Sequence, residues 1–319
     1  MRKHNMHVLL IVVLVAANLI LGQTVDAAKR VSLATGGTAG TYYPIGAAIT
    51  AIITKYVPGV EATAESTGAS VANLKMIAAK KVDFIMGAAN TSLAAFIGEA
   101  PFKEPIKNIR GITALYPETF QFIVLKKSGM ATVKDLKGKK VAVGAPGSGT
   151  ERTANLILEA HGLTYNDIKP QFLSFGEGVT ALKDRLIDCV IVGSGIPTSA
   201  VVDASATLDI TLLSMEKQIA DKMTQKYAFL RQVTIPEGTY KGVNIDVLTM
   251  ASPALLSTYE DMDDETVYQI TKAIFSHLDE LSSAHAQGKN ITLDGALKGM
   301  SIPLHPGAEK FYKEKGVLQ

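Results

Sequence analysis

Hydrophobic and polar positions alternate between two periods along the first third of the chain. Residues 31–35 follow the two-residue alternation of a short strand, and residues 45–56 then place isoleucines at helical spacing. A second strand is expected at residues 60–65, a helix at about 70–80 and a further strand at 82–87. Because strands and helices alternate in this way, the pattern predicts βαβ units and a mostly parallel sheet, and hence an α/β fold.

The same order of elements returns in the middle of the chain. A strand is expected at residues 140–143, a helix at 151–161 and an apolar strand at 187–192. In both halves a Val-x-x-Leu-Lys segment comes before a strand with an aspartate between hydrophobic residues, Asp83 or Asp188. These aspartates are either buried acids or structural groups at a strand edge. We predict two lobes of related topology, with chance similarity between ordinary βα units as the alternative.

Two apolar stretches connect the repeated halves. Residues 112–126 have the pattern of a strand that crosses from the first half, and residues 232–249 are the candidate for the crossing back. Helices are then expected at 264–286, 294–299 and 307–315. The lobes are therefore predicted to be interleaved, with the two crossings as a hinge. The predicted division is a leader at 1–27, a first lobe at 28–120 plus 240–319, and a second lobe at 121–239.

The first 27 residues have the pattern of a secretory signal peptide. Residues 2–4 are basic, residues 8–21 are almost entirely apolar, and residues 25–27 fit cleavage after Ala27. The apolar run is shorter than the roughly 20 residues that span a bilayer. An uncleaved membrane anchor is the alternative. The sequence predicts a soluble protein that is exported to the periplasm.

Composition narrows the possible functions. With 319 residues, a 47% hydrophobic fraction and 19% charged residues, the chain is neither disordered nor collagen-like. A net charge of +2 gives no reason to expect nucleic acid as a partner. The single cysteine, Cys189, excludes an internal disulfide and a multi-cysteine metal site, and it is expected to be an inert core residue.

Two glycine-rich loops, at residues 36–41 and 144–150, each lead into a predicted helix. The N-terminus of a helix presents unpaired backbone N–H groups at the positive end of the helix dipole, and it can therefore bind an anion. Gly144 and Gly149 have P-loop spacing, but the lysine that this motif needs is absent, and the dinucleotide-binding pattern lacks its third glycine. We expect anion binding without nucleotide chemistry, with tight turns that bind nothing as the alternative.

Side chains suited to catalysis or metal binding are sparse. The sequence has no Gly-x-Ser-x-Gly motif, and the histidines after the leader lack the spacing of a shared metal site. The acidic run at residues 263–265 fits the start of a helix, where carboxylates offset the dipole. We expect a binding protein with no catalytic residue, no metal and no cofactor.

Residues 34–46, which read Ala-Thr-Gly-Gly-Thr-Ala-Gly-Thr-Tyr-Tyr-Pro-Ile-Gly, closely resemble the opening of the TAXI family. This family contains the extracytoplasmic solute receptors of tripartite ATP-independent periplasmic (TRAP) transporters. The likeness continues at 65–74, 114–118, 143–151 and 193–201, and so covers nearly all of the chain after the leader. It implies a type II periplasmic binding protein fold, in which two α/β lobes joined by a hinge close around a ligand cleft.

The resemblance also implies a function. The chain would be a receptor, monomeric when free, that captures a small carboxylate or dicarboxylate such as glutamate or 2-oxoglutarate and delivers it to a TRAP-type permease. Tyr42, and Tyr116 as a second candidate, would pack against the carbon chain of the ligand, although hinge packing is the alternative for Tyr116. The ligand-binding residues carried over by the resemblance are Thr38, Gly40, Thr41, Tyr42, Thr67, Ser70, Asn90, Ser92, Ser148, Gly149, Thr150, Gly195 and Pro197.

One departure from the family pattern concerns the ligand. Where the family usually has Gln-Ser-Asp, this chain has Asn90-Thr91-Ser92. The change removes a carboxylate and shortens an amide, which favours a ligand without an amine. Three other functions stay open: an ABC-type substrate-binding protein, the ligand-sensing partner of a signalling receptor, and an exported enzyme of the same fold.

Overall fold

The computed structural model describes residues 28–318, and the predicted signal peptide at residues 1–27 lies outside the described residues. The strands are β1 (Lys29–Ala34), β2 (Val60–Glu65), β3 (Phe84–Ala88), β4 (Ile109–Leu125), β5 (Lys140–Ala142), β6 (Lys169–Gln171), β7 (Cys189–Ser194), β8 (Ile210–Leu212), β9 (Arg231–Ile235) and β10 (Val247–Tyr259). The helices are α2 (Tyr42–Tyr56), α3 (Ser70–Ala78), α4 (Ala89–Ile97), α5 (Gly149–Ala160), α6 (Phe175–Lys183), α7 (Ser199–Thr207), α8 (Lys217–Lys226), α9 (Asp264–Ser276), α10 (Leu278–Ala284) and α11 (Pro306–Glu314). Within residues 28–318, no helix has the length and apolar character needed to cross a membrane.

The strands form one continuous sheet that repeats the same arrangement in both halves. Its order is β2-β1-β3-β10-β4-β7-β5-β6, with β8 paired to β4 and β9 paired to β10. β1 runs parallel to β2 and β3, and β5 runs parallel to β6 and β7. A long antiparallel strand then continues each set, β10 beside β3 and β4 beside β7. The related topology predicted for the two halves is confirmed by these pairings.

The aspartates that follow the repeated motif have matching structural roles. The Asp83 carboxylate accepts a hydrogen bond of 2.8 Å from the backbone N–H of Ser32 in β1. The Asp188 carboxylate accepts one of 2.8 Å from the backbone N–H of Lys140 in β5. Each aspartate therefore joins the start of one parallel strand to the neighbouring strand. Of the two roles left open by the sequence, the structural one at a strand edge is the one observed.

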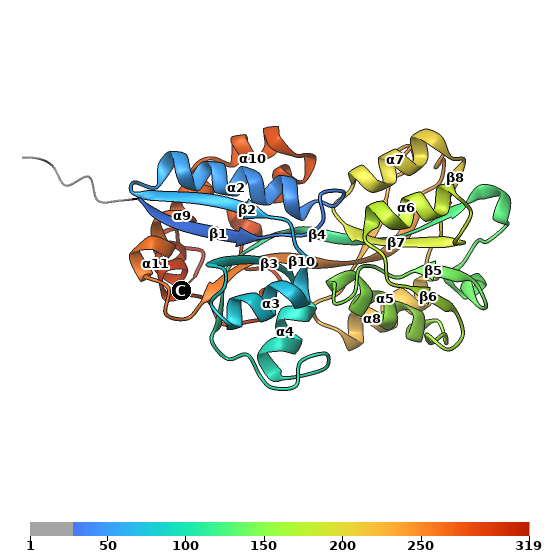
Figure 1. Cartoon of the computed structure of the whole chain (residues 1–319), viewed down its shortest axis with the longest axis horizontal. Coiled ribbons are helices and arrows are strands. Elements are labelled where there is room, and N and C mark those ends of the chain that lie inside the picture. The colour runs from blue at the N-terminus through green and yellow to red at the C-terminus, as the bar shows by residue number, and fades with distance from the viewer. Residues whose placement is uncertain (1–27, 319) are drawn as a thin grey trace, which may run out of the picture.

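The long strands β4 and β10 connect the two halves. They lie side by side along the long axis of the molecule, with α2, α9 and α11 around one end and α5 to α8 around the other (Figure 1). The crossings predicted at residues 112–126 and 232–249 differ in their bounds. β4 begins earlier, and the return is made by β9 and then β10, which ends at Tyr259.

Buried apolar side chains form four clusters among the described residues. Two clusters contain residues from 31–116 and 254–312, and the other two contain residues from 120–250. This separation of the clusters supports the proposed division into two lobes. It differs from the predicted boundary at residue 240, because Tyr240 and Val247 pack with the second lobe rather than with the first. The reason is that β10 pairs with β9 in its first part and with β3 only from Ala254 onward.

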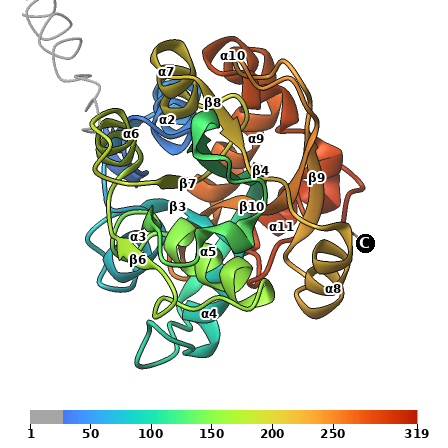
Figure 2. The same cartoon turned by 90° about the vertical axis from the view of Figure 1, so that its right-hand side faces the viewer.

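β7 shows how helices cover both faces of the sheet. Cys189 and Ile191 pack in the same cluster as α5, whereas Val190 and Val192 pack with α6. Successive side chains of a strand point to opposite faces, which is why α5 and α6 lie on opposite sides of β7 (Figure 2). The burial of Cys189 confirms its prediction as a core residue, and burial raises the pKa of its thiol.

The C-terminal helices are shorter than predicted. The helix expected at 264–286 is two helices, α9 and α10, because the backbone of His277 leaves the helical region (φ −132°, ψ 42°). The His277 ring stacks on Tyr56 with ring centroids 3.5 Å apart. The helix expected at 294–299 is only a 3-10 turn at Leu293–Gly295.

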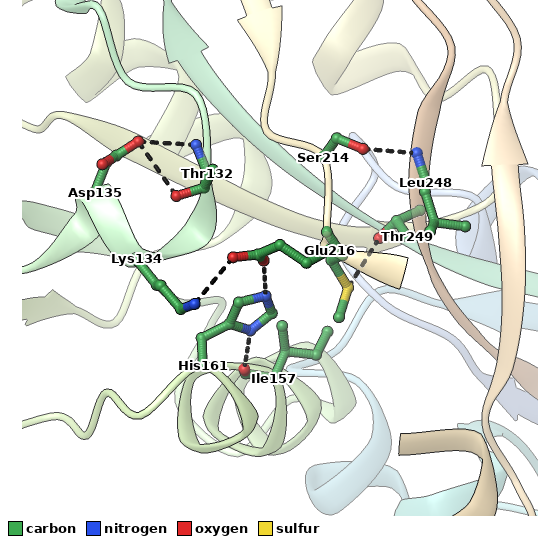
Figure 3. A network of polar contacts seen from close by, with 10 residues as sticks. Thr132, Lys134, Asp135, Ile157, His161, Ser214, Glu216, Leu248 and Thr249 are labelled. Atoms are coloured by element: carbon green, nitrogen blue, oxygen red, sulfur yellow. Dashed lines mark hydrogen bonds and ion pairs between the residues drawn. The ribbon is translucent and has the colours of Figure 1, made fainter. Parts of the chain in front are cut away.

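A polar network fixes the C-terminal end of α5 (Figure 3). The Nδ1 atom of buried His161 lies 2.7 Å from the carbonyl oxygen of Ile157, and its Nε2 atom lies 3.1 Å from a carboxylate oxygen of Glu216. The Lys134 ammonium lies 3.1 Å from the other oxygen of Glu216. Burial lowers the pKa of His161, while the Ile157 carbonyl and the charge of Glu216 oppose this shift. The network therefore joins α5 to two segments that are distant in sequence.

Substitution of Asp83 by alanine tests the role of the strand-edge aspartates. The change leaves the backbone N–H of Ser32 without its 2.8 Å acceptor, and we expect it to lower the free energy of unfolding by about 1 kcal/mol. Asp188→Ala is the matched control, because Asp188 is exposed and water can replace its oxygen, so its effect should be smaller. Urea denaturation followed by circular dichroism measures both values. Equal, negligible effects would show that the aspartates contribute nothing.

Candidate functional site

A cavity of about 270 Å³ lies between the two halves, at the carboxyl ends of the parallel strands. Its walls are loops that follow β1, β2, β5 and β6, together with the last two residues of β7 and one side chain from the middle of β4. The lining residues are Gly36, Gly37, Thr38, Ala39, Gly40, Thr41, Tyr42, Ser66, Thr67, Gly68, Ala69, Ser70, Glu118, Ala145, Ser148, Gly149, Thr150, Ser174, Phe175, Gly176, Gly193 and Ser194.

Four helices, α2, α3, α5 and α6, begin at this cavity. Their N-cap residues are Thr41, Ala69, Ser148 and Ser174, and all of them line it. Each helix N-terminus carries the equivalent of about half a positive charge, because its first N–H groups lack partners within the helix. Four such termini around one cavity create a strong preference for a negatively charged ligand.

Local sequence explains why α5 and α6 begin where they do. The Ser148 hydroxyl accepts a hydrogen bond of 3.1 Å from the N–H of Glu151. Ser174 and Glu177 form a capping box, in which each side chain accepts from the backbone N–H of the other residue. Among the residues that the structure describes, the first N–H groups of α5 and α6 have no protein acceptor, so they are free to bind an anion. These groups belong to Gly149, Thr150, Phe175 and Gly176.

Direct hydrogen bonds hold the two halves together around the cavity. The Thr41 N–H donates to Ser194 Oγ at 3.1 Å, and this hydroxyl donates to Thr41 Oγ1 at 2.9 Å. The Val71 N–H donates to the carbonyl oxygen of Gly147 at 3.0 Å. The observed conformation is therefore closed, with backbone groups of one half paired to the other.

Gly149 allows this close approach. A Cβ atom at Gly149 would lie 2.8 Å from the Cβ of Ala88 and 2.8 Å from Ser70 Oγ, both in the first half. A larger residue would therefore separate the start of α5 from α3 and α4. Gly149 is therefore needed for the contact between the halves.

Most of the residues implied by the family resemblance line the cavity. They are Thr38, Gly40, Thr41, Tyr42, Thr67, Ser70, Ser148, Gly149 and Thr150. These predicted ligand-binding residues therefore lie around one cavity.

The structure places Asn90, Ser92, Gly195 and Pro197 outside the cavity lining. The Asn90 amide donates to Thr153 Oγ1 at 2.7 Å and so forms another contact with α5. Ser92 is buried within α4. The side chain of Gln287 covers Gly195, and Pro197 is exposed on the surface. The substitution noted at Asn90-Thr91-Ser92 therefore does not alter the cavity wall itself.

The two tyrosines expected at the ligand differ in position. Tyr42 lines the cavity, whereas Tyr116 does not and packs in the core cluster of the first half. Burial, and next the charge of Glu118, raises the pKa of both hydroxyls well above the ordinary range, so both are uncharged. The packing alternative for Tyr116 is the one observed.

Sequence reasoning missed Glu118, which is the only ionisable residue with a carboxyl group in the described lining. It lies in β4, is 7% exposed, and its Oε2 atom has no hydrogen-bond partner within residues 28–318. Burial raises the pKa of Glu118 to about 8, and the neighbouring Tyr42 hydroxyl partly opposes this shift. No lysine, arginine or histidine occurs in the described lining. The cavity thus combines helix N-termini with one acid that is protonated at neutral pH.

Ser174, Phe175, Gly193 and Ser194 are further lining residues that were missed. The Ser174-x-x-Glu177 spacing is a capping-box pattern that could have located the start of α6 at the cavity. Glu118 had a local signal as well, because it is the only charged residue between Arg110 and Lys126 and belongs to the segment at 114–118 that resembles the family. Within residues 28–318, no three His, Cys, Asp or Glu side chains form a group that could hold a metal ion.

Comparison with known proteins places the chain among binding-protein folds. The sequence model of a family described as NMT1-like matches residues 33–316. The similar solved structures include the three that follow. The periplasmic aliphatic sulphonate binding protein SsuA from Escherichia coli is 15% identical, with 89% of this chain and 83% of that chain covered and a TM-score of 0.50. PhnD1 from Prochlorococcus marinus, solved with methylphosphonate, is 11% identical, with 91% and 100% covered and a TM-score of 0.55.

The third structure is the substrate binding protein of an amino acid ABC transporter, described without an organism. It is 13% identical, with 82% of this chain and 99% of that chain covered and a TM-score of 0.51. At these identities the likeness concerns the fold. It confirms the predicted α/β fold of the periplasmic binding protein type.

The buried Glu118 predicts a pH dependence of stability. The pKa of Glu118 is about 8 in the folded protein and near 4.5 in the unfolded chain, so between these values folding requires a proton that the unfolded chain does not bind. The free energy of unfolding is therefore highest at low pH and decreases as pH rises from about 4.5 to 8. The decrease is at most about 1.4 kcal/mol per pH unit. Glu118→Gln removes the effect, so the variant should gain stability relative to the wild type as pH rises.

Urea denaturation at several pH values across this window measures the difference. Glu65→Gln is the matched control, since it makes the same chemical change at an exposed position and should follow the wild-type profile. Parallel profiles for the wild type and Glu118→Gln would contradict the raised pKa.

Proposed function

Because the chain belongs to the NMT1-like family, whose sequence model matches residues 33–316, we propose that it is a periplasmic solute-binding protein that captures a small anionic solute. The single observation that carries this proposal is the convergence of four helix N-termini on one cavity between the halves. Such a site binds an acid group through backbone N–H groups and dipoles, without a basic side chain. Its small volume fits a metabolite rather than a polymer.

The proposed ligand is a small carboxylate or dicarboxylate of the glutamate or 2-oxoglutarate type. Two similar structures are described with other acids, a sulphonate in one case and methylphosphonate in the other. The chemistry common to all of these ligands is an acid group with several oxygens. We favour a carboxylate because this is what the sequence motifs at the cavity imply.

Binding would proceed through closure of the two lobes around the ligand. The acid group would first meet the N–H groups of one lobe, and the other lobe would then add its own helix N-termini. Closure forms the bonds from Thr41 to Ser194 and from Val71 to Gly147. Because closure restricts the chain, the ligand must bind the closed form better than the open one to drive it.

The proposed partner is a membrane transporter that accepts the solute. One similar structure belongs to an ABC transporter, which supports an ABC-type system as the first candidate. A TRAP-type permease is the second candidate and rests on the sequence motifs at residues 34–46 and 143–151 alone. A sensing role beside a signalling receptor would use the same cavity and the same closure.

A ligand screen tests the proposed function. Protein that starts at Ala28 is mixed with C4 and C5 dicarboxylates, amino acids, alkanesulfonates and methylphosphonate, and its thermal unfolding is recorded. We expect a stabilising shift with one class of acid and no change in that acid on prolonged incubation. Formation of a product would favour the exported enzyme instead, and no shift with any acid would overturn the proposal.

Substitutions at two helix starts test whether the loops bind the ligand. Thr41→Ala removes an acceptor of the Ser194 hydroxyl, and Ser148→Ala removes the cap of α5. Each should weaken binding of the acid found in the screen by roughly 1–2 kcal/mol, measured by calorimetry. Asp263→Ala is the control, because it removes the cap of α9 away from the cavity and should reduce stability only. Unchanged affinity in both cavity variants would mean that the loops are only structural.

The energy source of uptake distinguishes the two candidate transporters. Cells that carry the chain and its transporter are given radiolabelled ligand under ATP depletion or with an ionophore that dissipates ion gradients. An ABC-type partner predicts that uptake stops on ATP depletion and persists with the ionophore. A TRAP-type partner predicts that the ionophore stops uptake while ATP depletion at a maintained gradient does not.

A further inference from the structure

Glu118 occupies an unusual place in the sheet and in the cavity. It lies in β4 opposite Ser252 of β10, and the next residue of β4, Thr119, pairs with Ser194 of β7. The side chain therefore lies where β4 passes from one half to the other. It lines the cavity, is 7% exposed, and its Oε2 atom has no hydrogen-bond partner among the described residues.

An ionised carboxylate at this position would have no basic side chain of the described lining to pair with. The titratable side chains that act on Glu118 are Tyr42 from α2 and Tyr116 from β4 itself, and both are uncharged because burial raises their pKa values. The position facing Glu118 in β10 is Ser252, and the nearest paired residue of β7, Ser194, faces Thr119. The described lining contains no basic side chain. Burying an unpaired charge is costly, so the neutral acid is favoured here.

A neutral carboxylic acid can do what a carboxylate cannot, because its O–H group donates a hydrogen bond. The helix N-termini around Glu118 favour an anion in the same cavity, and an anion beside an ionised Glu118 would be repelled. With the proton retained, the carboxyl group of Glu118, which lines the cavity, can donate a hydrogen bond to an anion bound there. A buried acid kept neutral in order to donate is an established device in protein sites.

We propose that Glu118 is a specificity-determining residue whose carboxylic acid donates a hydrogen bond to an oxygen of the bound anion, so that the protein binds this ligand together with one proton. The inference rests on the proposed function, since it requires an anion in the cavity. It agrees with a ligand that lacks an amine, because an ammonium group would instead require Glu118 to ionise. At a pH below the pKa of Glu118 in the ligand-free protein, the carboxyl group already carries this proton. At a pH above that pKa, Glu118 takes the proton from solvent as the ligand binds.

The test measures affinity by calorimetry between pH 7 and pH 9, with 2-oxoglutarate and methanesulfonate as probes because their own charge is constant in this range. We expect the wild type to lose about tenfold in affinity over these two pH units, since above pH 8 the free protein must take up a proton to bind. In Glu118→Gln the amide donates at every pH, so its affinity should not change with pH. Glu65→Gln, with the same change at an exposed position, should keep the wild-type dependence.

Proton uptake supplies a second readout that needs no variant. Wild-type titrations at pH 9 in two buffers of different ionisation enthalpy should report uptake of about one proton per ligand bound. Affinity that rises with pH, together with proton release, would overturn the inference and indicate a ligand cation paired with ionised Glu118. Affinity independent of pH would also overturn it while leaving the proposed function intact. Failure of every anion to bind at any pH would overturn the proposed function and the inference together.

Discussion

Unpaired backbone N–H groups at helix N-termini are the constraint on which the organisation of this protein depends. In a parallel βαβ arrangement each helix begins beyond the carboxyl end of a strand, so the positive ends of successive helices come together at one edge of the sheet. The chain repeats this arrangement in two halves and turns the two edges toward each other. Four helix N-termini then surround one cavity, and the proposed anion-binding site needs no basic side chain in the described lining.

The closed arrangement depends on close contacts between the two halves. Gly149 brings the start of α5 against Ser70 and Ala88, and Thr41 and Ser194 exchange hydrogen bonds across the boundary. The hydrogen bonds across this boundary are polar contacts, whereas the buried apolar clusters lie within the halves. Polar contacts lose little when water replaces them. Such a boundary can open and close, while β4 and β10 keep the halves connected.

Glu118 gives this cavity a chemical character that the helix termini alone would not. Helix dipoles attract any small anion, and they discriminate poorly between acids of similar size. A buried carboxyl group without a partner makes ligand preference depend on whether that group is protonated and on which ligand group lies beside it. In the proposed site, general attraction by backbone groups and selection by the Glu118 side chain would therefore be separate functions.

The sequence by itself determined the features that depend on neighbouring residues. The periods of the apolar residues predicted the alternating strands and helices, and the loops at 36–41 and 144–150 located two of the helix starts at the cavity. The repeated aspartates revealed the related halves, because Asp83 and Asp188 each follow the same local motif.

Only the tertiary structure decided which side chains face the cavity. Asn90 was expected at the ligand but is bonded to Thr153, whereas Glu118 lines the cavity from the middle of a long, mostly apolar strand. The difference has a physical reason. Helix starts and strand periods follow from local backbone geometry, whereas desolvation and hydrogen-bond satisfaction depend on residues that folding brings together from far apart, such as Tyr42 beside Glu118 and Thr41 beside Ser194.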